Sequence, residues 1–220
     1  MNFTLSVIPI LSIILSLVLV GITVWRKTFV MFLPLVLYVL TCTTFGTGAY
    51  VVSHRNRPLT TDYFLEYYTW DLLLSILGYV VLSWLTYKLL PAPATGPLGP
   101  RLIAILVFLG VLYSALLITS GPTLFSRRAY QLEVLVSVSA VVFCLIVWWI
   151  VRATKNRPRV LLNILCGLAV MYGTTVTSYA PRLFRGSAIA DPLNLIHALG
   201  YVASLCIWLY AVAHQPHRAR

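Results

Sequence analysis

The sequence contains few charged residues and very few acidic ones. Charged residues make up 10% of the 220 positions, only five residues are Asp or Glu, and hydrophobic residues reach 60%. A soluble domain of this size could not cover so much apolar surface, so the composition favours an integral membrane protein. The net charge of +11 would suggest a nucleic-acid partner in a soluble protein. Here the basic residues lie in short segments between apolar runs, so we expect the lipid bilayer as the partner and no nucleic acid.

Several chemically active residue types are rare or lack the spacing that their function requires. The only lysines are Lys27, Lys88 and Lys155, so the last apolar run has no lysine that could carry retinal. The four cysteines fall inside apolar runs without metal-ligand spacing, which is typical of small buried hydrophobes. No nucleotide-binding, kinase or nucleophile-elbow motif is present. We therefore expect no cofactor and no metal, and a non-enzymatic protein rather than an enzyme.

Haem and zinc sites are the metal-dependent alternatives that the sequence allows us to test. A bis-histidine haem needs two axial ligands at one depth, and the residue that could approach His197 is His54, which falls in an expected loop. A zinc hydrolase needs three clustered ligands, and the candidates are His197, Asp71 and Glu133. Neither pattern predicts a metal site.

Seven apolar runs are long enough to cross a membrane as helices, because about 20 residues span roughly 30 Å of hydrocarbon. Pro9 and Pro34 lie inside these runs and are expected to kink them, while most other prolines, Pro181 among them, fall at boundaries. The first run is too long for a signal core and follows no basic residue, so we expect no cleaved signal peptide. We predict an all-α bundle of seven transmembrane helices that forms a single domain over residues 1–220. The expected spans are Phe3–Trp25, Thr28–Ser53, Asp62–Tyr87, Leu102–Ser120, Arg128–Val151, Val160–Ala180 and Pro192–Ala213.

The basic residues divide unequally between the two sides of this predicted bundle. One side has six, namely Arg55, Arg57, Arg127, Arg128, Arg182 and Arg185. The other side has ten, namely Arg26, Lys27, Lys88, Arg101, Arg152, Lys155, Arg157, Arg159, Arg218 and Arg220. The side with more Lys and Arg is expected to be cytoplasmic, which places the N-terminus outside and the C-terminus inside.

Polar side chains are expected to gather at one depth near the outer end of the bundle. At 1.5 Å per helical residue, Asp71, Glu133 and His197 lie about 26–29 Å outward from the nearest basic or histidine residue of the inner boundary. The same counting reaches Thr43–Thr47 and Thr174–Ser178. Charge inside hydrocarbon is costly and tends to mark a functional site, so this layer predicts an outward-facing pocket.

The candidate pocket residues repeat at spacings of three or four, which places them on one face of each helix. They are Tyr67, Asp71, Ser75, Tyr130, Glu133, Thr174, Ser178, Asn194, His197 and Tyr201. A competing interpretation is purely structural. In that case Glu133 pairs with Arg127, or Asp71 with Arg128, and the hydroxyl groups serve helix packing.

A short internal repeat suggests that the chain contains two related halves. The sequence Leu-Gly-Tyr-Val at 77–80 recurs at 199–202, and the same offset brings the first predicted helix over the fifth. This is a three-plus-one-plus-three plan, and in length, topology and N-out orientation the chain resembles parallel-repeat sugar transporters. It lacks their pattern of a proline in the first two helices of both repeats. The first repeat has Pro9 and Pro34, but the fifth helix contains no proline and the sixth has only Pro158 at its edge.

The chain also resembles a family of uncharacterised bacterial seven-helix membrane proteins of about this length. The resemblance rests on the short loops, the Tyr/Phe-rich segment Tyr63–Trp70 that opens the third span, and Trp208-Leu209-Tyr210 near the end of the seventh. It implies a seven-helix fold and a location in the bacterial inner membrane. The resemblance implies no particular activity.

Two functions fit these patterns. The first is a non-enzymatic binding, sensory or complex-subunit module with a polar pocket near the outer face, acting on an unknown small ligand, on another membrane subunit or as a homo-oligomer. The alternative is a small-solute or proton-coupled transporter. The predicted inner halves of the helices are almost purely apolar, which disfavours a complete transport pathway and places binding first.

Overall fold

The structure is a computed structural model that describes residues 3–54, 61–89, 122–153, 159–185 and 190–214. Side chains are described for 7–48, 70, 73–74, 77–89, 131, 133–152, 159–181 and 193–214. The helices of the described part are α1 (Phe3–Trp25), α2 (Leu33–His54), α3 (Thr61–Leu89), α6 (Pro122–Ala153), α7 (Arg159–Arg185) and α8 (Ala190–Ala213). The expected span Leu102–Ser120 lies outside the described residues.

The prediction of an all-helical membrane protein is confirmed for this part of the chain. Four segments are long and apolar enough to cross a membrane, namely Val7–Trp25, Glu133–Arg152, Arg159–Pro181 and Leu193–Ala213. A shorter apolar helical segment covers Leu33–Gly48. Their outward surfaces carry many exposed aliphatic and aromatic side chains, as the lipid-facing side of a membrane bundle requires.

The prolines depart in part from expectation. Pro9 lies inside α1, as the sequence predicts. Pro34 was expected to kink a span but is the second residue of α2, where a helix does not need a backbone N–H donor. Pro181 was expected at a helix boundary, yet α7 continues past it to Arg185.

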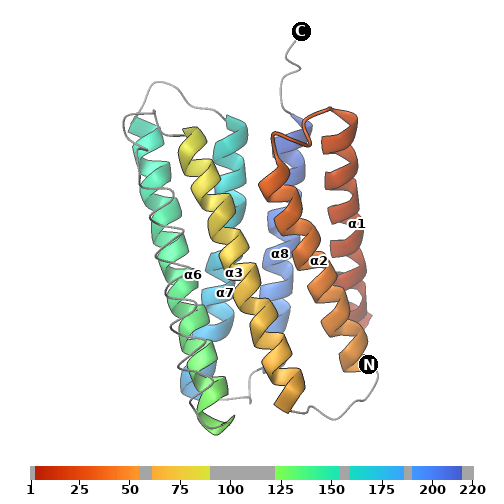
Figure 1. Cartoon of the computed structure of the whole chain (residues 1–220), viewed down its shortest axis with the longest axis vertical. Coiled ribbons are helices and arrows are strands. Elements are labelled where there is room, and N and C mark those ends of the chain that lie inside the picture. The colour runs from red at the N-terminus through yellow and green to blue at the C-terminus, as the bar shows by residue number, and fades with distance from the viewer. Residues whose placement is uncertain (1–2, 55–60, 90–121, 154–158, 186–189, 215–220) are drawn as a thin grey trace.

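The six helices form a closed ring in which each packs against the next, in the order α1, α2, α3, α6, α7 and α8, and α8 packs back against α1. α3 also contacts α7 across the ring. Helices α1, α3, α6 and α8 run in one direction, and α2 and α7 run in the other (Figure 1). One end of the bundle therefore carries Arg26, Lys27, Lys88, Arg152 and Arg159, and we call it the basic end. The N-terminus of α1 lies at the opposite end, which we call the far end.

The turn between α1 and α2 closes with a capping motif at the basic end. The amide of Thr28 donates to the carbonyl of Thr23 (2.9 Å), and that of Lys27 donates to the carbonyl of Val24 (3.0 Å). Lys27 itself has a φ of 57°, the left-handed conformation that this cap requires. The turn reverses the chain within a few residues, so α2 runs back beside α1.

The half of the bundle nearest the basic end is a packed apolar core. Phe32, directly before α2, meets Trp84 of α3 edge to face, with ring centroids 6.2 Å apart. Trp208 of α8 is fully buried and donates its indole N–H to the carbonyl of Ile164 on α7 (3.0 Å). Other fully or almost fully buried side chains of this core are Leu19, Leu35, Val36, Leu82, Leu85, Val147, Leu165, Leu168 and Leu205.

Small residues allow α7 and α8 to approach closely. A Cβ atom on Gly167 would collide with the indole of Trp208, and one on Gly200 would collide with the side chain of Thr174. The hydroxyl of Ser204 lies 2.8 Å from the carbonyl oxygen of Gly167 and 2.9 Å from that of Gly200. Close backbone approach through small residues, with an interhelical hydrogen bond, is a common way to join helices in lipid. This seam fixes the position of α8 relative to α7.

Candidate functional site

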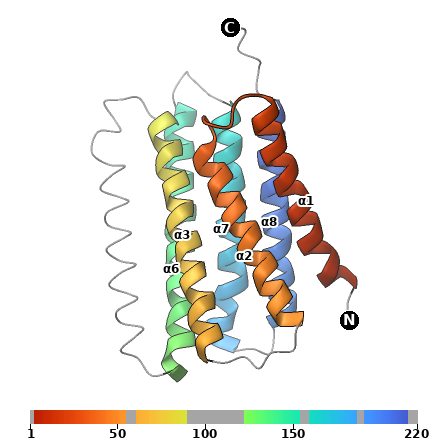
Figure 2. The same ribbon diagram turned by 45° about the vertical axis from the view of Figure 1, so that its right-hand side comes forward.

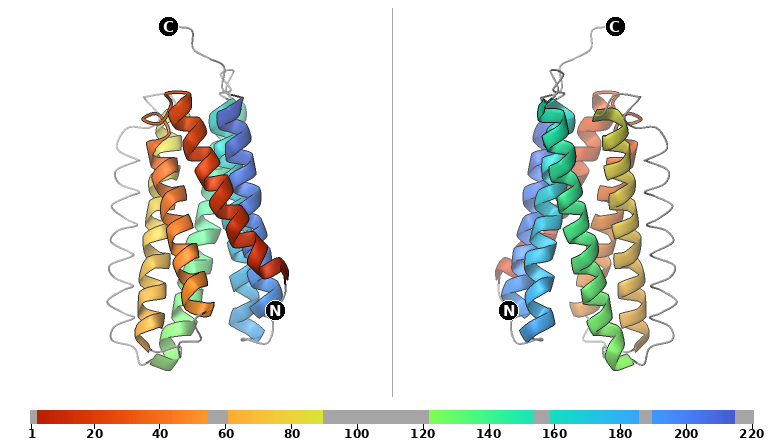
Figure 3. Two further views of the ribbon diagram at one scale, coloured as in Figure 1. Left: turned by 90° about the vertical axis from the view of Figure 1, so that its right-hand side faces the viewer. Right: turned by 90° about the vertical axis from the view of Figure 1, so that its left-hand side faces the viewer.

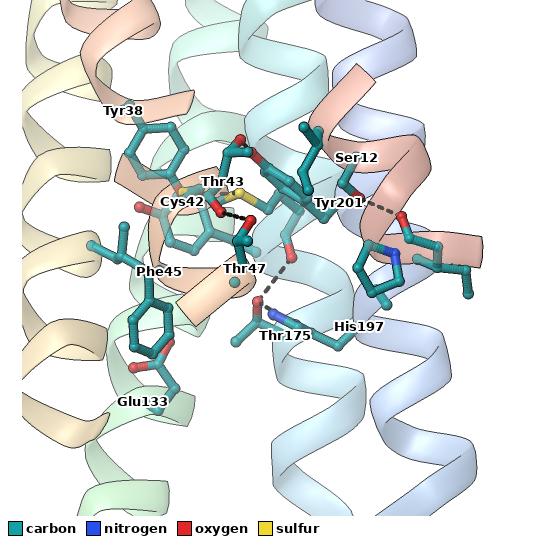
Figure 4. A pocket seen from close by; sticks show the side chains of 18 of the residues that line it. Ser12, Tyr38, Cys42, Thr43, Phe45, Thr47, Glu133, Thr175, His197 and Tyr201 are labelled. Atoms are coloured by element: carbon teal, nitrogen blue, oxygen red, sulfur yellow. Dashed lines mark hydrogen bonds between the residues drawn. The ribbon is translucent and has the colours of Figure 1, made fainter. Parts of the chain in front are cut away.

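A cavity of about 300 Å³ lies between the helices, in the part of the bundle toward the far end. All six described helices contribute to its wall, and the close-up in Figure 4 shows its polar members. Its lining residues are Ile8, Pro9, Ser12, Ile13, Tyr38, Cys42, Thr43, Phe45, Gly46, Thr47, Leu74, Glu133, Met171, Tyr172, Thr175, Tyr179, His197, Ala198 and Tyr201. The wall is mostly apolar and contains five aromatic rings, which is typical of a small-molecule site.

A chain of hydroxyl groups joins three helices at one side of the cavity. Thr43 of α2 donates to Ser16 Oγ of α1 (2.7 Å), and Ser16 donates to the carbonyl of Ser12 (2.7 Å). The Tyr201 hydroxyl of α8 lies 3.3 Å from Thr43 Oγ1 and can donate to it. With these directions each hydroxyl uses its one proton, so the chain is satisfied and ties α1, α2 and α8 together.

His197 of α8 contacts α7 through two side chains. Its Nδ1 lies 3.4 Å from Thr175 Oγ1, and its ring centroid lies 5.8 Å from that of Tyr179. The Thr175 hydroxyl also donates to the carbonyl of Met171 (3.0 Å). Because a hydroxyl has a single proton, we assign Nδ1 as the donor to Thr175, which fixes the tautomer of a neutral His197.

A tyrosine pair lies deeper in the cavity wall, nearer the apolar core. The Tyr38 hydroxyl donates to Met171 Sδ (2.9 Å), and the Tyr38 ring packs edge to face on Trp208 at 6.2 Å. Tyr172 is 3% exposed, and its hydroxyl has no hydrogen-bond partner in the described part of the chain. That hydroxyl lies against Gly78 of α3, where a Cβ atom would collide with it. A buried hydroxyl without a partner is unusual, because it loses the hydrogen bonds that water would give it.

Glu133 is the one described lining residue with a formal charge, and no Lys or Arg is among the described lining residues. Figure 4 shows Glu133 and Phe45 at one side of the cavity and His197 with Thr175 at the other. The carboxylate and the imidazole are therefore separated by the width of the cavity.

The structure brings only some of the sequence-predicted residues into the cavity. Glu133, His197 and Tyr201 line it. Thr174, Ser178 and Asn194 do not. Thr174 is occupied in the seam against Gly200, Ser178 is buried and donates to the carbonyl of Thr174, and Asn194 is exposed. The remaining four predicted residues belong to described helices, but the structure does not describe their side chains. They are Tyr67, Asp71, Ser75 and Tyr130. The side chains of Arg127 and Arg128 are not described either, so the ion pairs of the structural interpretation also lie outside the described residues.

The cavity also contains residues that the sequence-based list left out. All of its α1 residues are among them, together with the aromatic residues of α2 and α7. The i, i+4 spacing of Met171, Thr175 and Tyr179 on α7 could have identified that face, and Tyr38 and Cys42 have the same spacing on α2. On α1, Ser12 and Ser16 have this spacing too, whereas Ile8, Pro9 and Ile13 carry no polar signal.

Among the described residues, no three His, Cys, Asp or Glu side chains come together in a group that could hold a metal ion. The described arrangement offers hydrogen-bonding groups, aromatic surface and one carboxylate. Comparison of the chain with protein-family models, curated protein sequences and solved structures finds no match.

Proposed function

We propose that the chain is a non-enzymatic binding, sensory or complex-subunit protein of the membrane, and that its cavity holds a small ligand. The observation that carries this proposal is the cavity itself, which all six described helices line while the other half of the bundle is densely packed. Protein interiors rarely leave such a space unfilled. Polar side chains on its wall, Thr43 and Thr175 among them, offer hydrogen-bonding groups to such a ligand.

Transport is the second candidate, and the ring of helices favours it. If α1–α3 and α6–α8 are taken as two units, every contact in the ring has a counterpart. The contact between α1 and α2 corresponds to that between α6 and α7, and the contact between α2 and α3 to that between α7 and α8. The contact between α3 and α6 corresponds to that between α8 and α1. Corresponding helices also run in the same direction, as a parallel three-plus-one-plus-three repeat requires. Against transport stands the packed core between the cavity and the basic end, which offers no polar path.

The direction of the helices supports seven spans. α3 and α6 both run toward the basic end, whereas helices joined by one short loop run in opposite directions (Figure 1). One further span between them, over the predicted Leu102–Ser120, would restore the alternation. We place this bundle in a bacterial inner membrane, with its exposed apolar faces against lipid, another membrane subunit or a second copy of the chain.

The ligand can be tested by filling the cavity at Ala198. Ala198→Leu should reduce the amount of a small molecule that copurifies in mild detergent, as measured by native mass spectrometry, because Ala198 lines the cavity and the added atoms would occupy part of it. Ala203→Leu is the matched control, since Ala203 is exposed on the same helix and does not line the cavity. If no molecule copurifies with the wild type and added ligands never stabilise it, the cavity is a packing void and the binding function is wrong.

The orientation can be tested with reporters. Because ten basic residues lie on one predicted side and six on the other, green fluorescent protein fused after Arg220 should fluoresce in the cytoplasm. Alkaline phosphatase inserted between Arg57 and Pro58 should be active outside. The reverse pattern would place the cavity toward the cytoplasm and would refute the outward-facing site.

A further inference from the structure

The basic end of the bundle gathers cations without an acidic residue beside them in the described part of the chain. All five Asp and Glu residues of the sequence lie in the first halves of α3, α6 and α8, which are the halves toward the far end (Figure 1). A surface with one sign of charge attracts ligands of the other sign. The basic end is therefore complementary to an anion. Its described basic residues are Arg26, Lys27, Lys88, Arg152 and Arg159.

Exposed aromatic rings accompany these cations. Trp25 is 82% exposed at the last residue of α1. Lys88 Nζ lies 5.9 Å from the ring centroid of Tyr87, and the guanidinium carbon of Arg152 lies 5.0 Å from that of Trp148. Trp and Tyr are enriched where the hydrocarbon of a bilayer meets its headgroups. These rings therefore place the cations at the level of the lipid phosphates.

The turn between α1 and α2 presents one of these cations in a fixed position. Lys27 is exposed, and its ammonium group forms no hydrogen bond or ion pair with any residue of the described part. Its φ of 57° is a conformation that glycine adopts more readily, and backbone strain of this kind is concentrated at functional sites. The neighbouring Arg26 donates to the carbonyl of Val212 (3.5 Å), which ties the turn to the end of α8. Figure 2 shows the turn and the end of α8 side by side.

An exposed apolar stripe on α1 leads up to this turn. Ile14, Val18, Gly21 and Trp25 are spaced by four, three and four residues, so they share one face of the helix, and all of them are exposed. In the left view of Figure 3, α1 crosses in front of α8, and no described helix covers its outer side. The stripe is about 17 Å long at 1.5 Å per residue, close to the ~15 Å of one leaflet. An acyl chain can therefore lie along α1 while its headgroup reaches the turn.

We propose that the turn between α1 and α2 holds the headgroup of an anionic phospholipid. The ammonium group of Lys27 contacts the phosphodiester, Arg26 positions the turn on α8, and an acyl chain lies along the exposed stripe of α1. The ligand comes from the surrounding leaflet, because the apolar stripe continues directly into the turn. This inference goes beyond the proposed function and does not depend on the cavity, since Lys27 is not among the cavity-lining residues. Loss of this lipid and loss of a cavity ligand are therefore separate results.

Native mass spectrometry in mild detergent tests the proposal with two added lipids that have the same acyl chains. The wild type should bind phosphatidylglycerol, which is anionic, in preference to zwitterionic phosphatidylethanolamine. Lys27→Gly should weaken the binding of phosphatidylglycerol about fivefold, the effect of one basic residue near an anionic surface, and leave phosphatidylethanolamine unchanged. Glycine suits the left-handed conformation, so the variant should fold and unfold thermally at no lower temperature than the wild type. Lys27→Arg keeps the charge and should keep the preference. Equal binding of the two lipids by the wild type, or full binding of phosphatidylglycerol by Lys27→Gly, would overturn the proposal.

Arg159→Gln is the matched control, because it also removes one positive charge from the basic end. Arg159 begins α7, which is not a neighbour of α1 or α2 in the ring of described helices, so this variant should retain phosphatidylglycerol. Equal losses in Arg159→Gln and Lys27→Gly would show a diffuse attraction to the whole basic end and refute a site at the turn. Glycerol phosphate, which has the phosphate but no acyl chain, should not displace the lipid at the same concentration. Displacement by glycerol phosphate would show that the turn takes soluble phosphates and would refute the lipid as its occupant.

Discussion

Gly200→Ala is expected to lower the free energy of unfolding by about 1–3 kcal/mol, the usual cost of forcing extra atoms into a packed interface. The new Cβ atom would overlap the Oγ1, Cβ and Cγ2 atoms of Thr174 on the neighbouring helix. Thr174 cannot move these atoms away, because its Cβ is attached directly to the backbone and its hydroxyl donates to the carbonyl of Met171 (2.8 Å). The seam between α7 and α8 must therefore open. Thermal or denaturant unfolding in detergent measures the effect.

Gly173→Ala is the matched control on α7. A Cβ atom at Gly173 meets nothing within 4 Å, so this change should leave stability unchanged or raise it by up to about 1 kcal/mol through helix propensity. Combining Gly200→Ala with Thr174→Gly should recover part of the lost stability, because removal of the Thr174 side chain makes room for the new Cβ atom at position 200. If Gly200→Ala is as harmless as Gly173→Ala, the two helices do not pack as described.

Length and hydrophobicity predicted the described helices but not all of their ends. The bounds of α1 are those expected, and α8 begins at Ala190 rather than Pro192. By contrast, α2 begins at Leu33 rather than Thr28, and α6 at Pro122 rather than Arg128. Helix ends that depend on local chemistry were harder to predict. α7 continues through Pro181 to Arg185, and hydropathy does not report on where such a helix ends.

The sequence predicted a polar layer, and some of its residues line the cavity whereas others do not. Counting along the helices placed Glu133, His197 and the Thr43–Thr47 segment in one layer, and all of these contribute to the cavity. The inward-pointing face of each helix was harder to predict than the depth of its residues. Thr174 and Thr175 are adjacent and chemically alike, yet one packs on Gly200 and the other lies beside His197. A difference of 100° around α7 decides this, and the neighbouring helix sets it.

Most of the contribution of α1 could not be predicted, because polar residues were used to identify the cavity and Ser12 is the one polar lining residue among those described on this helix. Ile8, Pro9 and Ile13 line the cavity with apolar atoms, and their sequence does not differ from that of a lipid-facing surface. Only the packing of α1 against its neighbours shows which of them lie inside.

The largest loss of stability is expected for Trp208→Ala, at about 3 kcal/mol, the low end of the range for removing a buried tryptophan. The low end applies because lipid or detergent is nearly as apolar as the protein core, so the variant loses mainly packing and not transfer from water. Trp208 is 0% exposed, contacts Gly167 closely and donates to Ile164 across the seam. Its removal leaves a void that neighbouring helices cannot easily fill. Denaturant unfolding in detergent measures the loss.

Trp149→Ala is the control, because Trp149 is 69% exposed at the surface of α6 and should change the unfolding free energy by less than about 0.5 kcal/mol. Trp208 also supports the cavity, since Tyr38 packs on its ring and donates to Met171, and both of these line the cavity wall. Trp208→Ala should therefore also abolish copurification of the ligand, even at temperatures where the variant remains folded, while Trp149→Ala should retain it. Equal losses of stability in the two variants would contradict the packed core. Full ligand retention in a folded Trp208→Ala variant would show that the site does not depend on that core.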